Sequence, residues 1–135
     1  MKVIYTLALI AWFALNAGAQ ERTNIDSFTP KEFKENVTVE KLNSDKNQSS
    51  FIIWVSDTVK PHYHKTHTEC IYLLEGGGTF YMGKKKMELK VGDFVMIPEG
   101  VIHSYKHKTG KRSKVLSVQA PEFVGTDRIW VDIQE

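Results

Sequence analysis

A succession of short β-type runs between residues 51 and 119 limits the possible folds more than any other feature. The runs are residues 51–55, 70–74, 79–82, 87–91, 94–97, 101–106 and 115–119. In the run 87–91, Met87, Leu89 and Val91 alternate with charged residues, as in a strand with one face in solvent. Short strands at close spacing, with turn residues between them, are typical of an all-β sandwich or barrel.

Glycines and polar residues mark the expected ends of these strands. Gly76 and Gly92 each follow a β-type run, and glycine tolerates the positive φ of a tight turn. We therefore expect residues 70–74 and 79–82 to be separate strands. Residues 43–50 are all polar and predict a loop.

The first residues have the pattern of a secretory signal peptide. Lys2 is followed by an almost wholly apolar run over residues 3–15 and then by Ala17-Gly18-Ala19. The alternative is a retained membrane anchor, but a span needs about 20 apolar residues. An A-x-A site favours cleavage near Ala19-Gln20. We expect export to the periplasm or medium, with no membrane association of the mature form.

The rest of the chain is long enough for one domain. We divide it into a signal peptide (1–19), an N-terminal extension (20–45) and a barrel domain (46–135). In the extension, Thr29 and Pro30 predict the start of a short helix to about Asn36, and residues 37–39 predict a brief strand. The whole chain has a net charge of only +2, which gives no argument for nucleic acid.

Cys70 is the only cysteine. One cysteine cannot form a disulfide within the chain, so the fold must rest on its apolar core. We expect Cys70 to be a buried structural thiol rather than a reactive one.

Three histidines and a glutamate carry the clearest chemical signal. His62 and His64 are two residues apart, so they share one face of an extended segment. Glu69 follows after a polar turn, and His103 comes from a distant run. Imidazole and carboxylate groups are common ligands of divalent metals, and four of them leave positions open for water or substrate. The alternative is a set of core or surface histidines with no metal.

These residues lie in a pattern that resembles the cupin family. The first cupin motif is matched by His62-Tyr63-His64, four residues, Glu69, six residues and Gly76; the second is matched by Gly92, five residues, Pro98-Glu99-Gly100, two residues and His103. Ser56 stands where the first motif begins with glycine, and His107 where the second ends with asparagine. The resemblance covers about residues 50–120.

The resemblance implies a single jelly-roll β-barrel with one divalent metal ion inside its mouth. Zn, Cu, Mn, Fe and Ni are all candidates, and the ligands would be His62, His64, Glu69 and His103. Cupins with this ligand set include dioxygenases, isomerases, lyases and decarboxylases that act on small organic acids or phenols. A non-catalytic module that binds a metal or a small ligand is the alternative.

Three further residues are candidates for contact with a substrate. Tyr105 has the parity of His103 and could donate a proton, or it could simply line the barrel. His67, in the turn after His64, could touch substrate at the rim or lie in solvent. His107 could face the cavity and contact substrate or orient a neighbour, or it could end a strand in solvent.

A homodimer is also expected. In residues 51–55, apolar side chains occupy both faces of the predicted strand. If this were an edge strand, a small barrel could not bury both faces alone, and a two-fold partner is the commonest remedy.

Overall fold

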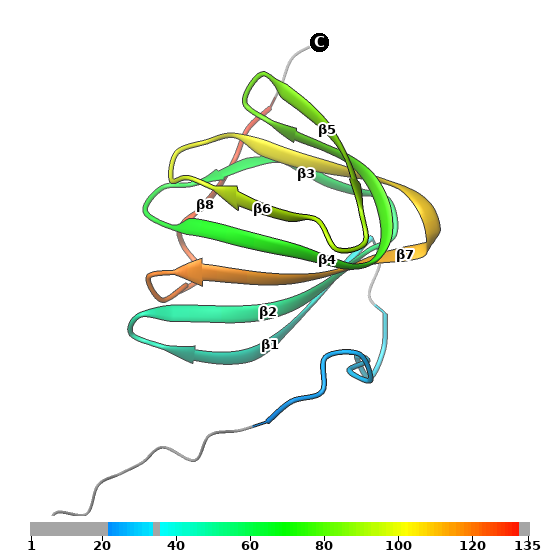
Figure 1. The fold of residues 1–135 in the computed structure, drawn as a ribbon. Helices are drawn as coiled ribbons and strands as arrows, with labels where there is room; N and C mark the ends of the chain where they lie inside the picture. Colours follow the sequence, from blue (N-terminus) through cyan, green and yellow to red (C-terminus); the bar gives the residue numbers. More distant parts are fainter. Residues whose placement is uncertain (1–21, 34–35, 133–135) are drawn as a thin grey trace, which may run out of the picture.

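The computed structural model describes residues 22–33 and 36–132 of the 135-residue chain. All regular elements in these ranges are strands, which form a curled antiparallel sheet closed into a barrel, so the predicted all-β jelly roll is confirmed (Figure 1). The predicted signal peptide, residues 1–19, lies outside the described residues. The predicted helix to Asn36 includes residues 34–35, also outside them, and stays a prediction. Nothing in the described ranges forms a helix of the length and hydropathy that a membrane span requires.

The eight strands are β1 (Val37–Asp45), β2 (Gln48–Val55), β3 (Thr58–His64), β4 (Thr68–Met82), β5 (Lys85–Lys90), β6 (Phe94–Ile97), β7 (His103–Ala120) and β8 (Arg128–Trp130).

Two long strands hold the barrel together. The second half of β7 pairs with β2 and with the first half of β4, which also pairs with β6. The first half of β7 pairs with β3 and with the second half of β4, which also pairs with β5. β4 and β7 therefore run through both layers of the barrel, and β1 and β8 extend the two layers at their margins.

The prediction that Gly76 ends a strand is wrong. Residues 70–74 and 79–82 both belong to β4, and residues 103–106 and 115–119 both belong to β7. Gly76 has a φ of +75°, and the pairing of β4 with β7 shifts register around it. A Cβ atom on Gly78 would lie 2.7 Å from Tyr105 Oη and would collide with the Lys106 carbonyl oxygen. The glycines thus bend β4 between the layers and let it approach β7 closely.

The polar segment 43–50 is not a loop but the tip of a hairpin. β1 continues to Asp45 and β2 begins at Gln48. Asp45 Oδ1 accepts hydrogen bonds from the backbone N–H groups of Asn47 and Gln48, at 2.8 and 3.0 Å. Ser44 and Ser49 lie opposite each other, and their hydroxyl oxygens are 2.7 Å apart. Cross-strand hydrogen bonds thus let polar residues form strands here.

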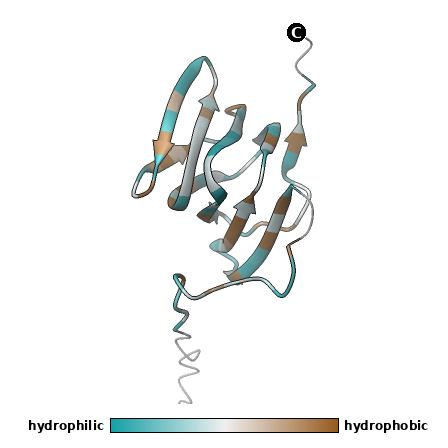
Figure 2. Ribbon diagram, turned by 90° about the vertical axis from the view of Figure 1, so that its right-hand side faces the viewer, coloured by the Kyte–Doolittle hydropathy of each residue, from teal (hydrophilic) through white to brown (hydrophobic). Residues whose placement is uncertain are grey.

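The core lies between the two layers. Its buried members come from β2, β4, β6 and β7: Val55, Phe80, Val95, Ile97 and Tyr105. Hydrophobic and hydrophilic residues alternate along the strands (Figure 2), as the period of two requires.

β2 is not an edge strand, so its two apolar faces give no reason to expect a dimer. It pairs with β1 on one side and with β7 on the other. On its outer face Ile52 is fully buried and Trp54 is 4% exposed. Phe28 and Phe33 cover Trp54, with ring centroids 6.1 and 6.0 Å from its ring. One chain therefore buries both faces of this strand, and the dimer itself stays a prediction.

Candidate metal centre

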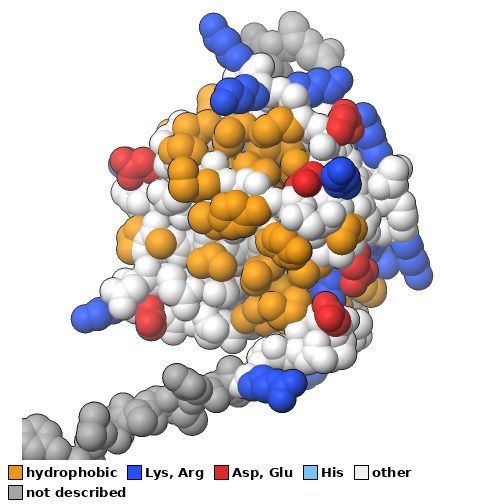
Figure 3. Space-filling view, in the orientation of Figure 1, with side chains coloured by type: hydrophobic (Ala, Val, Ile, Leu, Met, Phe, Trp, Pro, Cys, Tyr) orange, Lys and Arg blue, Asp and Glu red, His pale blue; other side chains and the backbone are white. Residues whose placement is uncertain are grey.

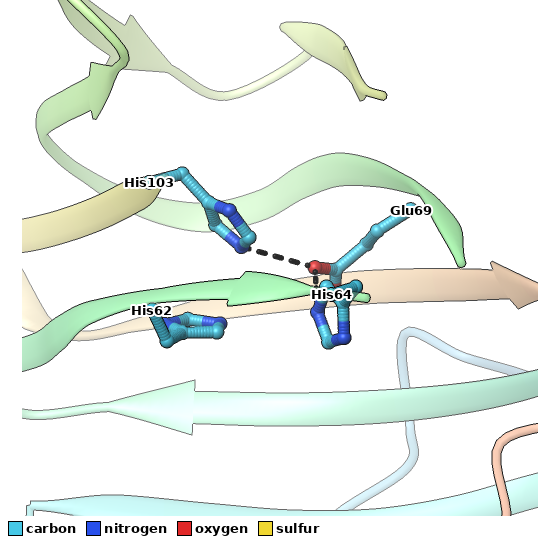
Figure 4. A group of neighbouring side chains, drawn as sticks. All are labelled: His62, His64, Glu69 and His103. Atoms are coloured by element: carbon cyan, nitrogen blue, oxygen red, sulfur yellow. Dashed lines mark hydrogen bonds and ion pairs between the residues drawn. The ribbon is translucent and has the colours of Figure 1, made fainter. Parts of the chain in front are cut away.

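The structure brings the four predicted ligands together at one end of the barrel. His62 and His64 lie on β3, Glu69 on β4 and His103 at the start of β7, and each is at most 5% exposed. His62 and His103 are directly opposite in the pairing of β3 with β7. The imidazole rings and the carboxylate point toward one another (Figure 4).

The distances are those of a cluster that one ion could bind. Glu69 Oε2 lies 3.0 Å from His64 Nε2 and 3.3 Å from His103 Nε2. One nitrogen or oxygen atom from each of the four residues lies within 4.8 Å of the others. Three nitrogens and one oxygen at this spacing match the ligand types of a borderline divalent metal.

Backbone carbonyls set which nitrogen of two histidines faces the cluster. His62 Nδ1 lies 2.8 Å from the Lys60 carbonyl oxygen, and His103 Nδ1 lies 3.0 Å from that of Val101. A carbonyl oxygen can accept a hydrogen bond but cannot donate one, so each Nδ1 carries a proton. In the neutral form of each ring, the lone pair is then on Nε2. His103 Nε2 is buried with no hydrogen-bond partner. A buried, unpartnered nitrogen aimed at a carboxylate is what a metal ligand looks like without its ion.

The protonation states also suit a metal. Burial, followed by repulsion from His103, lowers the pKa of His62 to about 4, so its ring is neutral near neutral pH. Burial alone would raise the pKa of Glu69, but the neighbouring rings of His103 and His64 and a hydrogen bond from Ser117 outweigh it and hold that pKa well below its usual range. A neutral imidazole and an ionised carboxylate are the states that bind metals.

The other oxygen of Glu69 is fixed by residues that the sequence analysis missed. Ser117 Oγ donates to Glu69 Oε1, and Gln119 Nε2 lies 3.3 Å from the same oxygen. Both come from β7 and are buried. The sequence does contain a signal for these two residues. They alternate with the apolar Leu116 and Val118, so both polar side chains lie on the inward face of the strand.

A second carboxylate, that of Asp127, lies behind His64 and was also missed. His64 Nδ1 lies 3.5 Å from Asp127 Oδ2. Asp127 accepts hydrogen bonds from the N–H and Oγ1 of Thr66, at 2.8 and 2.7 Å, and from His67 Nδ1. Burial opposes ionisation of Asp127, but these bonds, chiefly that of His67, lower its pKa to about 2. A carboxylate behind a ligating histidine orients the ring and makes it more basic.

Of the three predicted substrate-contact residues, His67 and His107 do not line the cavity, whereas Tyr105 does. His67 is 2% exposed, and its nitrogens bond Asp127 and the Glu122 carbonyl oxygen, so it is a buried part of this support and not a rim residue. His107 lies at the bend of β7, where its nitrogens contact Ser113 Oγ and the Gly110 carbonyl oxygen.

Tyr105 lines the interior, and its hydroxyl is 2.6 Å from Ser113 Oγ. Burial raises its pKa, although the Ser113 hydrogen bond opposes the change. Cys70 is half-buried, and burial raises the pKa of its thiol, so the cysteine is poorly suited to nucleophilic chemistry.

A cavity of about 80 Å³ opens beside His62, Glu69 and His103. Its other walls are mostly valine, isoleucine and leucine side chains from both layers, with Phe80 and Tyr105. It has the space of several water molecules, so a small molecule could reach the cluster.

Asp127→Asn is expected to weaken metal binding by about 10-fold or more, because His64 loses the charge that orients it. The dissociation constant would be measured by competition with a chelator. Asp57→Asn is the matched control, since Asp57 is an exposed carboxylate that pairs with Lys106 and belongs to no metal-ligand group in the described residues. Equal affinities in the two variants would show that Asp127 does not support the site.

The metal-free protein is expected to lose stability as the pH falls from 6.5 to about 4. His62 has a pKa near 6.5 when unfolded and about 4 when folded, so in this window the unfolded chain binds the proton and is favoured. The stability is fully present above pH 6.5. Thermal unfolding of chelator-treated protein would show a shallower pH dependence for His62→Gln than for the parent; parallel curves would contradict this assignment.

Comparisons with known proteins agree with the fold. A family model described as the cupin domain matches residues 50–119. An uncharacterised protein of Aquifex aeolicus is 33% identical over 119 residues, covering 78% of this chain and 98% of that protein. Quercetin 2,3-dioxygenase of Bacillus subtilis is 40% identical over 50 residues, which are 37% of this chain but only 15% of that enzyme.

Among solved structures, an uncharacterised conserved protein with a double-stranded beta-helix domain from Klebsiella pneumoniae has a TM-score of 0.71 at 14% identity. The alignment covers 83% of this chain and 97% of that one, and at this identity it supports the fold alone. The family model spans more than half of the chain, and the Aquifex match spans nearly all of that protein, so this chain belongs to the cupin family.

Proposed function

We propose that the protein is a metal-dependent enzyme that acts on a small organic molecule, with one divalent ion held by His62, His64, Glu69 and His103. The observation that carries the proposal is the buried His103 Nε2, which has no hydrogen-bond partner and faces the Glu69 carboxylate at the edge of an apolar cavity. When bound, the ion would act as a Lewis acid or a redox centre for the substrate.

The chain's own residues position the cluster. β3 and β7 set the rings of His62 and His103 through hydrogen bonds to backbone carbonyls. Ser117 and Gln119 hold the Glu69 carboxylate in one orientation. Such locked side chains keep the cluster in one geometry through a reaction cycle.

The similarity to a segment of quercetin 2,3-dioxygenase favours an oxygenase, with isomerase, lyase and decarboxylase reactions as other outcomes. The engaged hydroxyl of Tyr105 favours a second candidate, a non-catalytic module that binds a metal or small ligand. In that module no residue would need to transfer a proton.

A substrate screen separates the two candidates. Full-length mature protein loaded with Zn, Cu, Mn, Fe or Ni would be mixed with small phenols and carboxylic acids under air, and oxygen uptake and products followed. Turnover that disappears in His103→Ala supports the enzyme. Tight binding of a compound with no product from any metal form would overturn it in favour of the module.

We also propose that the protein is exported and acquires its metal outside the cytoplasm. The amino-terminal pattern supports export, and the affinity order of divalent metals favours copper and zinc over iron and manganese for a nitrogen-rich site. Metal analysis of protein from its native compartment and of cytoplasmic material tests this. Iron or manganese dominating in both would contradict it.

We also propose a homodimer, which would form through the exposed face of β6 and β4 and not through β2. Phe94 and Met96 on β6 are 63% and 56% exposed, and Tyr72 lies opposite Phe94 on β4. Hydrophobic side chains gather over a wide area on this face of the molecule (Figure 3). Large exposed apolar patches mark interaction sites, and two-fold pairing is the commonest arrangement.

Met96→Glu is accordingly expected to halve the mass measured by light scattering at micromolar concentration. Val124→Glu, at a residue that is exposed but lies on no strand, is the control and should leave the dimer intact. A parent protein that is already monomeric would contradict the proposal.

A further inference from the structure

We infer that Arg128 forms an anion-binding subsite beside the metal centre, so that the protein selects small apolar molecules that carry a carboxylate. The inference rests on the proposed function of the cavity and names its class of substrate. Arg128 lies on β8, a short strand that was not predicted from the sequence.

The pairing of β8 with β3 places two side chains beside the cluster. Arg128 is directly opposite His64, and Trp130 is directly opposite His62. Opposite residues of an antiparallel pair project from the same face of the sheet. Arg128 and Trp130 therefore share the face of the histidines, and the Trp130 and His62 ring centroids are 5.2 Å apart.

The charge of Arg128 is not neutralised by the described part of the chain. Its Nε is buried without a hydrogen-bond partner, and no carboxylate in that part forms an ion pair with it. Its guanidinium lies 5.7 Å from the ring centroids of both Phe123 and Trp130, which orient it without removing its charge. Burying part of a cation with no anion is costly, so the site favours a ligand that brings one.

The cavity defines the rest of the ligand. Arg128 lines it together with His62, Glu69 and His103. Among the cavity-lining residues described, Arg128 is the one lysine or arginine. The Glu69 carboxylate contacts His64 and His103. The remaining walls are largely apolar, and the volume is small. A guanidinium binds a carboxylate through paired N–H groups, which a neutral amide of the same shape cannot match.

Binding of benzoate and benzamide to the zinc-loaded, full-length mature protein tests the inference. The two probes have the same ring, and only benzoate is charged. Calorimetry is expected to show that benzoate binds at least about 10-fold more tightly than benzamide, because a hydrogen bond between charged groups contributes about that much affinity. Arg128→Gln should abolish the preference while leaving zinc content and benzamide affinity unchanged, and Arg128→Lys should restore part of it.

Arg112→Gln is the matched control, because Arg112 also lies over an aromatic ring, that of Phe33 at 3.8 Å, but does not line this cavity. Equal affinity of the parent protein for the two probes, or a benzoate preference retained in Arg128→Gln, would overturn the inference. Binding is measured without turnover, so an inactive protein that still shows the Arg128-dependent preference would count against the proposed enzyme and not against the subsite.

Discussion

Replacing His103 by alanine is expected to weaken metal binding by more than about 100-fold. This loss is larger than the one produced by replacing a residue that only supports a ligand, such as Asp127. His103 contributes a buried Nε2 with no other partner, 3.3 Å from Glu69 Oε2. Without it, two imidazoles and one carboxylate remain. Metal content would be measured by elemental analysis after dialysis against buffered zinc.

His107→Ala is the control for this variant. His107 lies on the same strand, but its ring bonds Ser113 and Gly110 and not the cluster. It should retain zinc as the parent protein does. Full occupancy in the His103→Ala protein would remove His103 from the ligand set.

Gly78→Ala is expected to cost about 3 kcal/mol of unfolding free energy, at the high end for an overpacked site. The added methyl group would collide with the Lys106 carbonyl oxygen and lie 2.7 Å from Tyr105 Oη. The colliding oxygen belongs to the backbone of β7, so relief requires the two central strands to separate. The measurement is denaturant unfolding of metal-free protein.

Gly83→Ala separates this steric effect from glycine's backbone freedom. Gly83 has a φ of +56°, but a Cβ there meets open space, so the cost should be only about 1–2 kcal/mol. If the two alanine variants were equally stable, the close approach of β4 to β7 at Gly78 would not matter to the fold.

The sequence pattern predicted those features that depend on local periodicity. The two-residue spacing of His62 and His64 predicts a shared face on any strand, and β3 has that form. In β5, Met87 and Leu89 alternate with exposed charged residues as expected, but Val91 lies beyond the end of the strand and is 58% exposed. Such features depend only on neighbouring residues, so one sequence suffices to find them.

Features that depend on distant partners were missed. Gly76 and Gly78 have the same local pattern whether they end a strand or bend it, and only the pairing of β4 with β7 decides. The three-residue strand β8 is too short for a periodic signal and exists because β3 pairs with it. Its neighbour Asp127 supports His64 across more than sixty positions of sequence, so nothing near either residue indicates the contact.

X-ray diffraction at the absorption edge of the metal, from crystals of the metal-loaded protein, shows directly whether one metal ion binds between β3, β4 and β7. We expect one anomalous peak, about 2.0–2.2 Å from the Nε2 atoms of the three histidines and from a carboxylate oxygen of Glu69. A peak at other residues, or no peak in protein shown by elemental analysis to contain the metal, would contradict it.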